Sequence, residues 1–153
     1  MDDRKILVAY FSGTGHTEEV ARKIADKVGG TLFEIRTAED YPESYAGKIA
    51  VGGRERLTRT RPEILNTVAD MDVYDTVMIG FPVWFSTCPM AVVSFLEEYD
   101  TTGKAIYPFY TSGGGSGARA IREIEKAAPY ADVKMCYNAS KYGTDKLDAW
   151  MEQ

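Results

Sequence analysis

The chain has 153 residues, a formal net charge of −5 and a pI near 5.0. This length is ordinary for one domain with a substantial core, and the acidic balance argues against nonspecific binding to nucleic acid. The sequence has no apolar stretch of bilayer-spanning length, and residues 1–5 lack the pattern of a signal peptide, so we expect a single cytoplasmic domain over residues 1–153 that binds no membrane.

Short apolar runs alternate with helical patterns along the chain. The apolar runs are Lys5–Tyr10, Thr31–Ile35, Asp75–Gly80, Ala105–Tyr110 and Asp132–Tyr137. Helical patterns cover Thr17–Val28, Pro89–Glu98, Gly117–Ala127 and Asp145–Met151. Apolar strands separated by helices predict an α/β fold, a doubly wound parallel sheet with helices on both faces. The long stretch 37–72 allows a helix over 45–56 and extended structure over 61–63.

The turn between the first strand and the first helix, residues 11–17, reads FSGTGHT. A strand that turns at glycines into a helix directs backbone N–H groups and the positive end of the helix dipole at one small volume. Hydroxyls of Ser12, Thr14 and Thr17 can add donors, and the loop contains no Lys or Arg. This pattern favours a terminal phosphate monoester. The plainer alternative is a capped helix start with Thr14 or Thr17 as the N-cap residue.

Four familiar phosphate sites do not fit this loop. An NTPase loop needs a lysine, and the dinucleotide fingerprint needs a third glycine where this chain has Glu18. A phosphotyrosine-phosphatase loop needs a cysteine nucleophile, which this segment lacks. A receiver domain needs acidic residues at the ends of the first and third strands, where the chain has Phe11 and Gly80–Pro82.

The loops after the third and fourth strands are also distinctive. Ligands of open α/β sheets bind beyond the carboxyl ends of the strands, so the loops after strands one, three and four should converge. Residues 80–89 read GFPVWFSTCP and residues 111–117 read TSGGGSG. Taken alone, Trp84 could cover the edge of the core, and the glycine run could be a plain connection.

With these three loops in this order, the chain resembles the flavodoxin family over almost its whole length. The resemblance implies a five-stranded sheet in the order 2-1-3-4-5, of the short-chain type, and noncovalently bound FMN. It implies that the phosphate is held by Ser12, Gly13, Thr14, Gly15, His16 and Thr17. The resemblance also implies that one segment lies against the flavin ring, with Trp84 stacked on the ring. This segment consists of Pro82, Val83, Trp84, Phe85 and Ser86. It implies that the polar edge of the ring is contacted by the third loop, which consists of Thr111, Ser112, Gly113, Gly114, Gly115, Ser116 and Gly117.

Several other residues have an ordinary interpretation beside a functional one. We interpret His16, the only histidine in the sequence, as an exposed residue rather than a proton donor. Cys88 and Cys136 lack a C-x-x-C pattern, so we expect two reduced thiols; Cys88 could have a lowered pKa at a helix start or could simply pack. We expect Trp150 to be structural. Residues that could flank the flavin or only cover the core are Tyr41, Tyr45 and Tyr142.

Three functions are compatible with these features. The favoured one is a one-electron carrier between redox partner proteins, which needs a charged docking rim and a stabilised one-electron-reduced flavin. The second is an FMN-dependent NAD(P)H:quinone-type reductase of a small electron acceptor, although the sequence shows no nicotinamide motif. The third is a domain that binds another phosphorylated ligand without redox chemistry. Either a monomer or a homodimer is compatible with the sequence.

Overall fold

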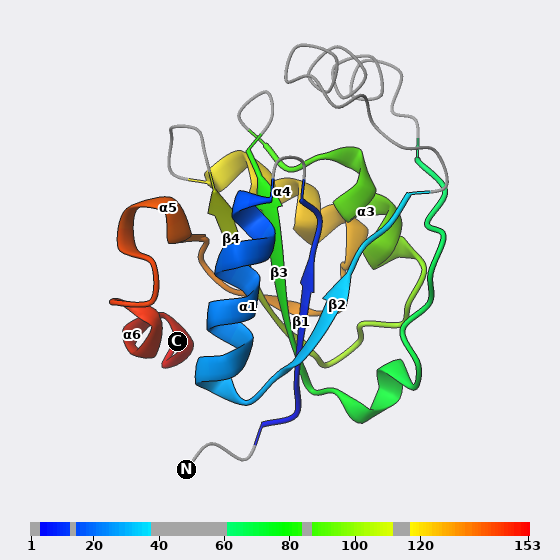
Figure 1. The fold of residues 1–153 in the computed structure, drawn as a ribbon. Helices are drawn as coiled ribbons and strands as arrows, with labels where there is room; N and C mark the ends of the chain where they lie inside the picture. Colours follow the sequence, from blue (N-terminus) through cyan, green and yellow to red (C-terminus); the bar gives the residue numbers. More distant parts are fainter. Residues whose placement is uncertain (1–3, 13–14, 38–60, 84–86, 112–116) are drawn as a thin grey trace, which may run out of the picture.

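The computed structural model describes residues 4–12, 15–37, 61–83, 87–111 and 117–153. Its centre is a parallel sheet in the order β2-β1-β3-β4-β5, in which β6 also pairs with β4 (Figure 1). The strands are β1 Ile6–Tyr10, β2 Thr31–Glu34, β3 Thr76–Pro82, β4 Ala105–Thr111, β5 Asp132–Val133 and β6 Tyr137–Asn138. The predicted parallel sheet and its 2-1-3-4-5 order are confirmed.

Helices cover both faces of the sheet, and alternate strand residues point to opposite faces. The helices are α1 His16–Val28, η1 Met71–Val73, α3 Met90–Glu97, α4 Ala118–Ala127, α5 Ala139–Tyr142 and α6 Leu147–Met151. Leu7 and Ala9 of β1 pack with α3 and α4, whereas Val8 and Tyr10 pack with α1 and α6. In the described part of the chain, no helix is long and apolar enough to span a bilayer.

Gly80 of β3 lies opposite Phe109 of β4 in the central sheet. A Cβ atom at this position would lie 2.2 Å from the ring of Phe109 on β4. The ring therefore fills the space that a side chain on β3 would need. Gly80 is buried and Phe109 is fully buried, so the sheet has little room to adjust there.

Two strands are longer than predicted, and one is interrupted. Pro82 and Thr111 are the last residues of β3 and β4 rather than loop residues, and the ladder continues through the bond from Val83 N to the Thr111 carbonyl, 3.0 Å. The predicted continuous strand 132–137 is wrong. It is broken over residues 134–136, where the Met135 backbone bonds to the side chains of Gln153 and Trp150 near the carboxyl terminus. The other predicted boundaries agree to within a residue or two.

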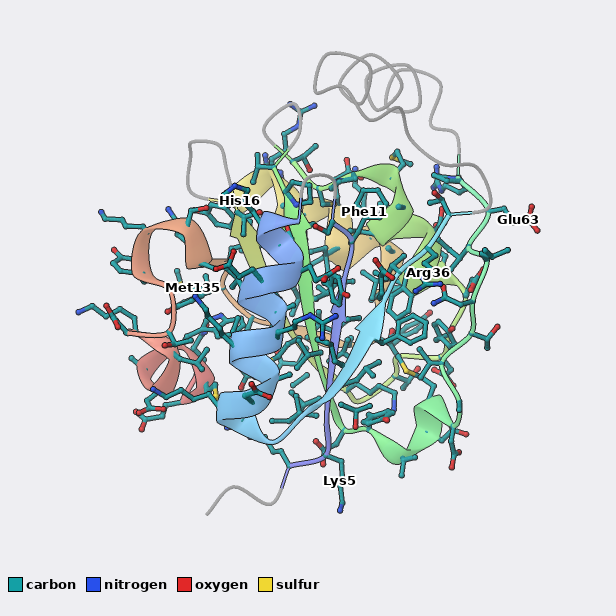
Figure 2. All side chains as sticks on the ribbon, viewed as in Figure 1. Lys5, Phe11, His16, Arg36, Glu63 and Met135 are labelled. Atoms are coloured by element: carbon teal, nitrogen blue, oxygen red, sulfur yellow. The ribbon has the colours of Figure 1, made fainter. Side chains whose placement is uncertain are left out.

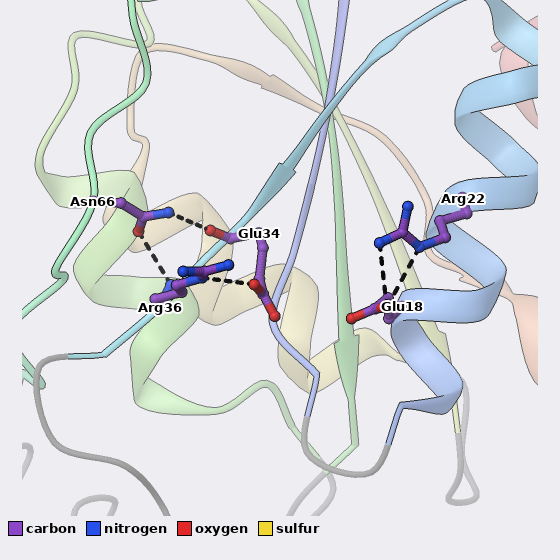
Figure 3. Close-up of polar contacts among 5 residues, drawn as sticks. All are labelled: Glu18, Arg22, Glu34, Arg36 and Asn66. Atoms are coloured by element: carbon purple, nitrogen blue, oxygen red, sulfur yellow. Dashed lines mark hydrogen bonds and ion pairs between the residues drawn. The ribbon is translucent and has the colours of Figure 1, made fainter.

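The outer edge of β2 is covered by the chain that returns toward β3. Thr37 and Ile64 form an isolated antiparallel bridge, and Leu65 N donates to the Arg36 carbonyl at 2.7 Å. The Asn66 amide donates to the Glu34 carbonyl and accepts from Arg36 N (Figure 3). Backbone groups at the carboxyl end of the edge strand and just beyond it thus have partners. Residues 61–63 have no regular structure, and the helix considered over 45–56 lies outside the described residues.

Candidate functional site

The described ends of three loops lie together at the carboxyl edge of the sheet. Phe11 follows β1 and its N–H donates to the Gly80 carbonyl of β3 at 2.9 Å. Phe11 and His16 lie at this edge, and Lys5 lies at the opposite one (Figure 2). The predicted convergence of the loops after β1, β3 and β4 is therefore present in their described ends. The loop residues that lie outside the described part are Gly13, Thr14, Trp84, Phe85, Ser86, Ser112, Gly113, Gly114, Gly115 and Ser116.

The start of α1 has backbone donors without helical acceptors. The helix is preceded by Gly15 in the left-handed conformation, with φ of 96° and no side-chain cap. The first helical bond runs from Glu19 N to the Gly15 carbonyl at 3.0 Å, so the amides of the three residues between them have no acceptor within the helix. Ser12 Oγ accepts from Gly15 N at 2.9 Å and closes the turn.

This geometry corrects the N-cap alternative for Thr17. Gly15 is the N-cap residue, because its positive φ turns the chain into the helix, and Thr17 is the second residue of the helix. Thr14, the other candidate cap, lies outside the described residues.

Thr17 and Thr111 are brought together although they are 94 residues apart. Their hydroxyl oxygens lie 2.7 Å apart in a buried hydrogen bond, and the two residues are 1% and 2% exposed. One comes from the predicted phosphate loop and the other from the predicted ring-edge loop. The bond therefore joins the first turn of α1 to the end of β4.

Acidic side chains near the end of β1 are paired with cations. Glu18 lies 3.4 Å from Arg22, and Glu34 lies 2.7 Å from Arg36 (Figure 3). Burial, then the negative charges of Glu34 and Glu18, and a hydrogen bond with Glu18 raise the pKa of Tyr10 to about 12. Tyr10 is therefore neutral at physiological pH, and each of the two carboxylates has a cationic neighbour.

The histidine and the two cysteines all lie in the described part of the chain. His16 is exposed at the first position of α1. The cysteines form no disulfide; Cys88 is fully buried in the core, and Cys136 is half-buried. Burial and the neighbouring Cys88 raise the pKa of the Cys136 thiol to about 12, so it stays protonated near neutral pH. For Cys88 the position in the core supports packing.

The carboxyl-terminal aromatics belong to the core on the α1 face. The Trp150 ring packs on Tyr137 with centroids 4.9 Å apart, and its Nε1 donates to the Met135 carbonyl at 2.8 Å. Its predicted structural role is confirmed. Tyr142 is half-buried, with its ring 6.1 Å from that of Tyr137, and covers the edge of this core. Tyr41 and Tyr45 lie outside the described residues.

Thr87 was missed as a candidate. It directly follows the aromatic loop, is fully buried, and its hydroxyl has no hydrogen-bond partner among the described residues. A buried hydroxyl without a partner costs about 1–3 kcal/mol of folding free energy. The Thr87 hydroxyl is therefore suited to a hydrogen bond with a polar group from the loop or from a ligand. The only sequence signal was a Thr inside the segment 80–89.

A comparison with known protein families shows to which family this chain belongs. The family model described as flavodoxin matches residues 5–153. The chain belongs to the flavodoxin family. Among solved structures, this flavodoxin is similar to a provisionally assigned flavoprotein of Bacteroides eggerthii, at 32% identity and a TM-score of 0.88, with 98% and 97% of the two chains covered. A Lactobacillus acidophilus flavoprotein in complex with FMN shares the fold, at 21% identity and a TM-score of 0.82, with 97% and 99% covered.

Curated relatives of this flavodoxin are named as NAD(P)H dehydrogenases (quinone). An NAD(P)H dehydrogenase (quinone) of Acidovorax ebreus is 29% identical over 96 residues, which are 61% of this chain and 46% of the relative. One of Rhizobium meliloti, named NAD(P)H dehydrogenase (quinone) 3, is 32% identical over 61% of this chain and 43% of its own. The flavodoxin thus spans less than half the length of these relatives.

FMN is the cofactor of the family, and the described residues fit its phosphate end. A phosphate monoester accepts hydrogen bonds only, and the start of α1 supplies amides without helical acceptors beside a buried hydroxyl pair. Gly15 enters the helix with a positive φ, and a Cβ atom built there would lie within 4 Å of no atom among the described residues other than its neighbours in the chain. The flavodoxin therefore has the donors that this end of FMN requires.

Proposed function

We propose that this flavodoxin carries single electrons between redox partners through FMN bound at the carboxyl ends of β1, β3 and β4. The observation that carries the proposal is the meeting of the three loop ends at one edge, where the first turn of α1 has backbone donors without helical acceptors. Anions bind at such helix starts, and ligands of open α/β sheets bind at this edge.

The phosphate end of FMN is assigned to the loop after β1. Its ligands in this proposal are Ser12, Gly13, Thr14, Gly15, His16 and Thr17. The amides that precede the first helical bond point along the helix axis toward this loop, and the helix dipole adds positive potential there. Because the loop has no Lys or Arg, dipoles rather than a cation hold the charge.

The flavin ring is assigned to the other two loops. Residues 82–86 carry Trp84 against one face, and residues 111–117 contact the polar edge of the ring. When bound, FMN supplies reversible electron transfer, whose potential depends on the surrounding hydrogen bonds and charges. The protein contributes Gly117, with φ of 77° directly before α4, which fixes where the third loop ends.

The redox partner is expected to be a protein or a small electron acceptor. The net charge of −5 favours a basic partner, but the described acidic residues nearest the phosphate loop pair with Arg22, Lys23 and Arg36. These exposed pairs weaken the local field, so charge steers the encounter only modestly.

A second candidate is an NAD(P)H-dependent reductase of quinones. The names of the curated relatives favour it, and their similarity covers 61% of this chain. In that case an open face of the flavin would have to admit both substrates in turn.

Stepwise reduction of the FMN-loaded protein under anaerobic conditions separates the two candidates. A carrier shows two one-electron potentials, and each 59 mV between them is about tenfold in population. NAD(P)H should then reduce the protein slowly, with or without a quinone. A single two-electron step together with rapid NAD(P)H:quinone turnover would replace the carrier by the reductase. A purified protein that binds no flavin would reject both.

A further inference from the structure

The buried pair of Thr17 and Thr111 has more protons than its own bond uses. Each hydroxyl carries one proton and accepts through its lone pairs. The two oxygens lie 2.7 Å apart, so one proton lies between them and the other belongs to whichever hydroxyl accepts. Both residues are almost completely buried, so solvent is a poor partner for that second proton.

The two possible directions of the bond have different consequences. If Thr17 donates, its proton is used within the protein, and the proton of Thr111 must find an acceptor near the end of β4. If Thr111 donates, the proton of Thr17 remains for an acceptor beside the first turn of α1. The backbone donors at the start of α1 lie on that same side. An anion there meets donors of both kinds only in the second arrangement.

We propose that Thr111 is a positioning residue, which donates to Thr17 Oγ1 and thereby directs the Thr17 proton at the phosphate of FMN. A hydrogen bond to an ionised acceptor is roughly twice as strong as one between neutral groups, so a bound phosphate selects this direction. The proposal rests on the phosphate placement proposed above. It moves Thr111 from the ring edge, to which the sequence resemblance and the assignment of residues 111–117 above gave it, to the phosphate end of the site.

The hydroxyl of Thr111 can be removed with little change in side-chain shape. Thr111→Val has the same branching and no hydroxyl, whereas Thr111→Ser keeps the hydroxyl, and Thr17→Val gives the matched change at the other oxygen. Dissociation constants for FMN and for riboflavin, which lacks the phosphate, are measured for the wild type, these variants and the double valine variant. Thermal unfolding of each apoprotein checks that it folds.

Thr111→Val should weaken FMN binding about tenfold and change riboflavin binding by less than about twofold. Thr111→Ser should restore FMN binding. In the Thr17→Val background, Thr111→Val should have no further effect on FMN, because the proton that it directs is gone. If Thr111→Val does not fold, Thr111→Ala replaces it in the same cycle.

Three results would overturn the proposal. Equal losses for FMN and riboflavin would place Thr111 at the ring or in the fold alone. Independent effects of the two valine substitutions would show that Thr111 does not act through Thr17. Unchanged FMN binding in Thr111→Val would remove the role altogether. A wild type that binds FMN and riboflavin equally would instead reject the phosphate placement itself.

Discussion

Tyr10 shows how a single residue beside the site is held in one protonation state. Its side chain is buried, and this burial together with the negative charges of Glu34 and Glu18 raises its pKa to about 12. A raised pKa means that the folded state prefers the neutral phenol. The stability that this supplies is complete below pH 10 and is lost as the pH rises toward 12.

Tyr10→Phe should therefore flatten the alkaline loss of stability. Between about pH 9 and about pH 11.5 the wild type should lose up to about 2 kcal/mol more than the variant in urea unfolding experiments. Ionisation of the other tyrosines affects both proteins and cancels in the comparison. Equal losses in the two proteins would show that Tyr10 ionises as freely in the fold as in the unfolded chain.

The two tryptophans provide a matched pair for locating the flavin ring. Trp150 is packed on Tyr137 and Tyr107 in the core, whereas Trp84 belongs to the loop assigned to the ring. FMN binding should quench Trp84 fluorescence, so Trp84→Phe should abolish most of the quenching and Trp150→Phe should retain it. Trp84→Ala should weaken binding by about 0.5–1.5 kcal/mol from the lost aromatic contact. Quenching that disappears only in Trp150→Phe would contradict the assignment.

At the scale of elements, the contact between β3 and β4 depends on Gly80. Gly80→Ala would bring a Cβ to within 2.2 Å of the Phe109 ring, and the two residues lie opposite each other in the sheet. We expect a loss of about 1–3 kcal/mol in unfolding free energy. Phe109→Leu should relieve part of the clash. The double variant should therefore lose less unfolding free energy than the sum of the losses in the two single variants. Strict additivity would mean that the clash is relieved elsewhere.

The strands and helices were predictable because their signal is local. Continuous apolar runs marked β1 and β3, which are buried on both faces of the sheet. The interruption at Met135 was not predictable, because its backbone partners come from the distant carboxyl terminus. The extension of β4 to Thr111 likewise depends on a neighbouring strand.

For the candidate site, the sequence indicated which loops would meet but not how their side chains pair. The bond between Thr17 and Thr111 joins positions 94 residues apart and leaves no trace in local spacing. Thr87 also escaped notice, because only its burial and missing hydrogen-bond partner among the described residues distinguish it. The alternative of Thr17 as the N-cap residue is wrong, since glycine at positive φ replaces a side-chain cap there.

At the scale of the whole molecule, the fold gathers the loop ends on a rigid base. β1, β3 and β4 are neighbours in the sheet, and their residues in the core are packed on both sides by different helices. A site supported by packed strands holds its geometry better than one built on loops alone. The proposed placement of FMN rests on this arrangement, and its phosphate is the part that the described donors fit best.

Titration of the apoprotein with FMN and with riboflavin tests this placement most directly. The two ligands share the flavin ring and differ in the phosphate, so FMN should bind far more tightly. Replacing Thr14 and Thr17 by Ala should reduce that advantage, because each donor to a charged group contributes roughly 1.5–3 kcal/mol. Riboflavin binding should stay unchanged in the same variant. Equal dissociation constants for FMN and riboflavin in the wild type would contradict a phosphate site at the start of α1.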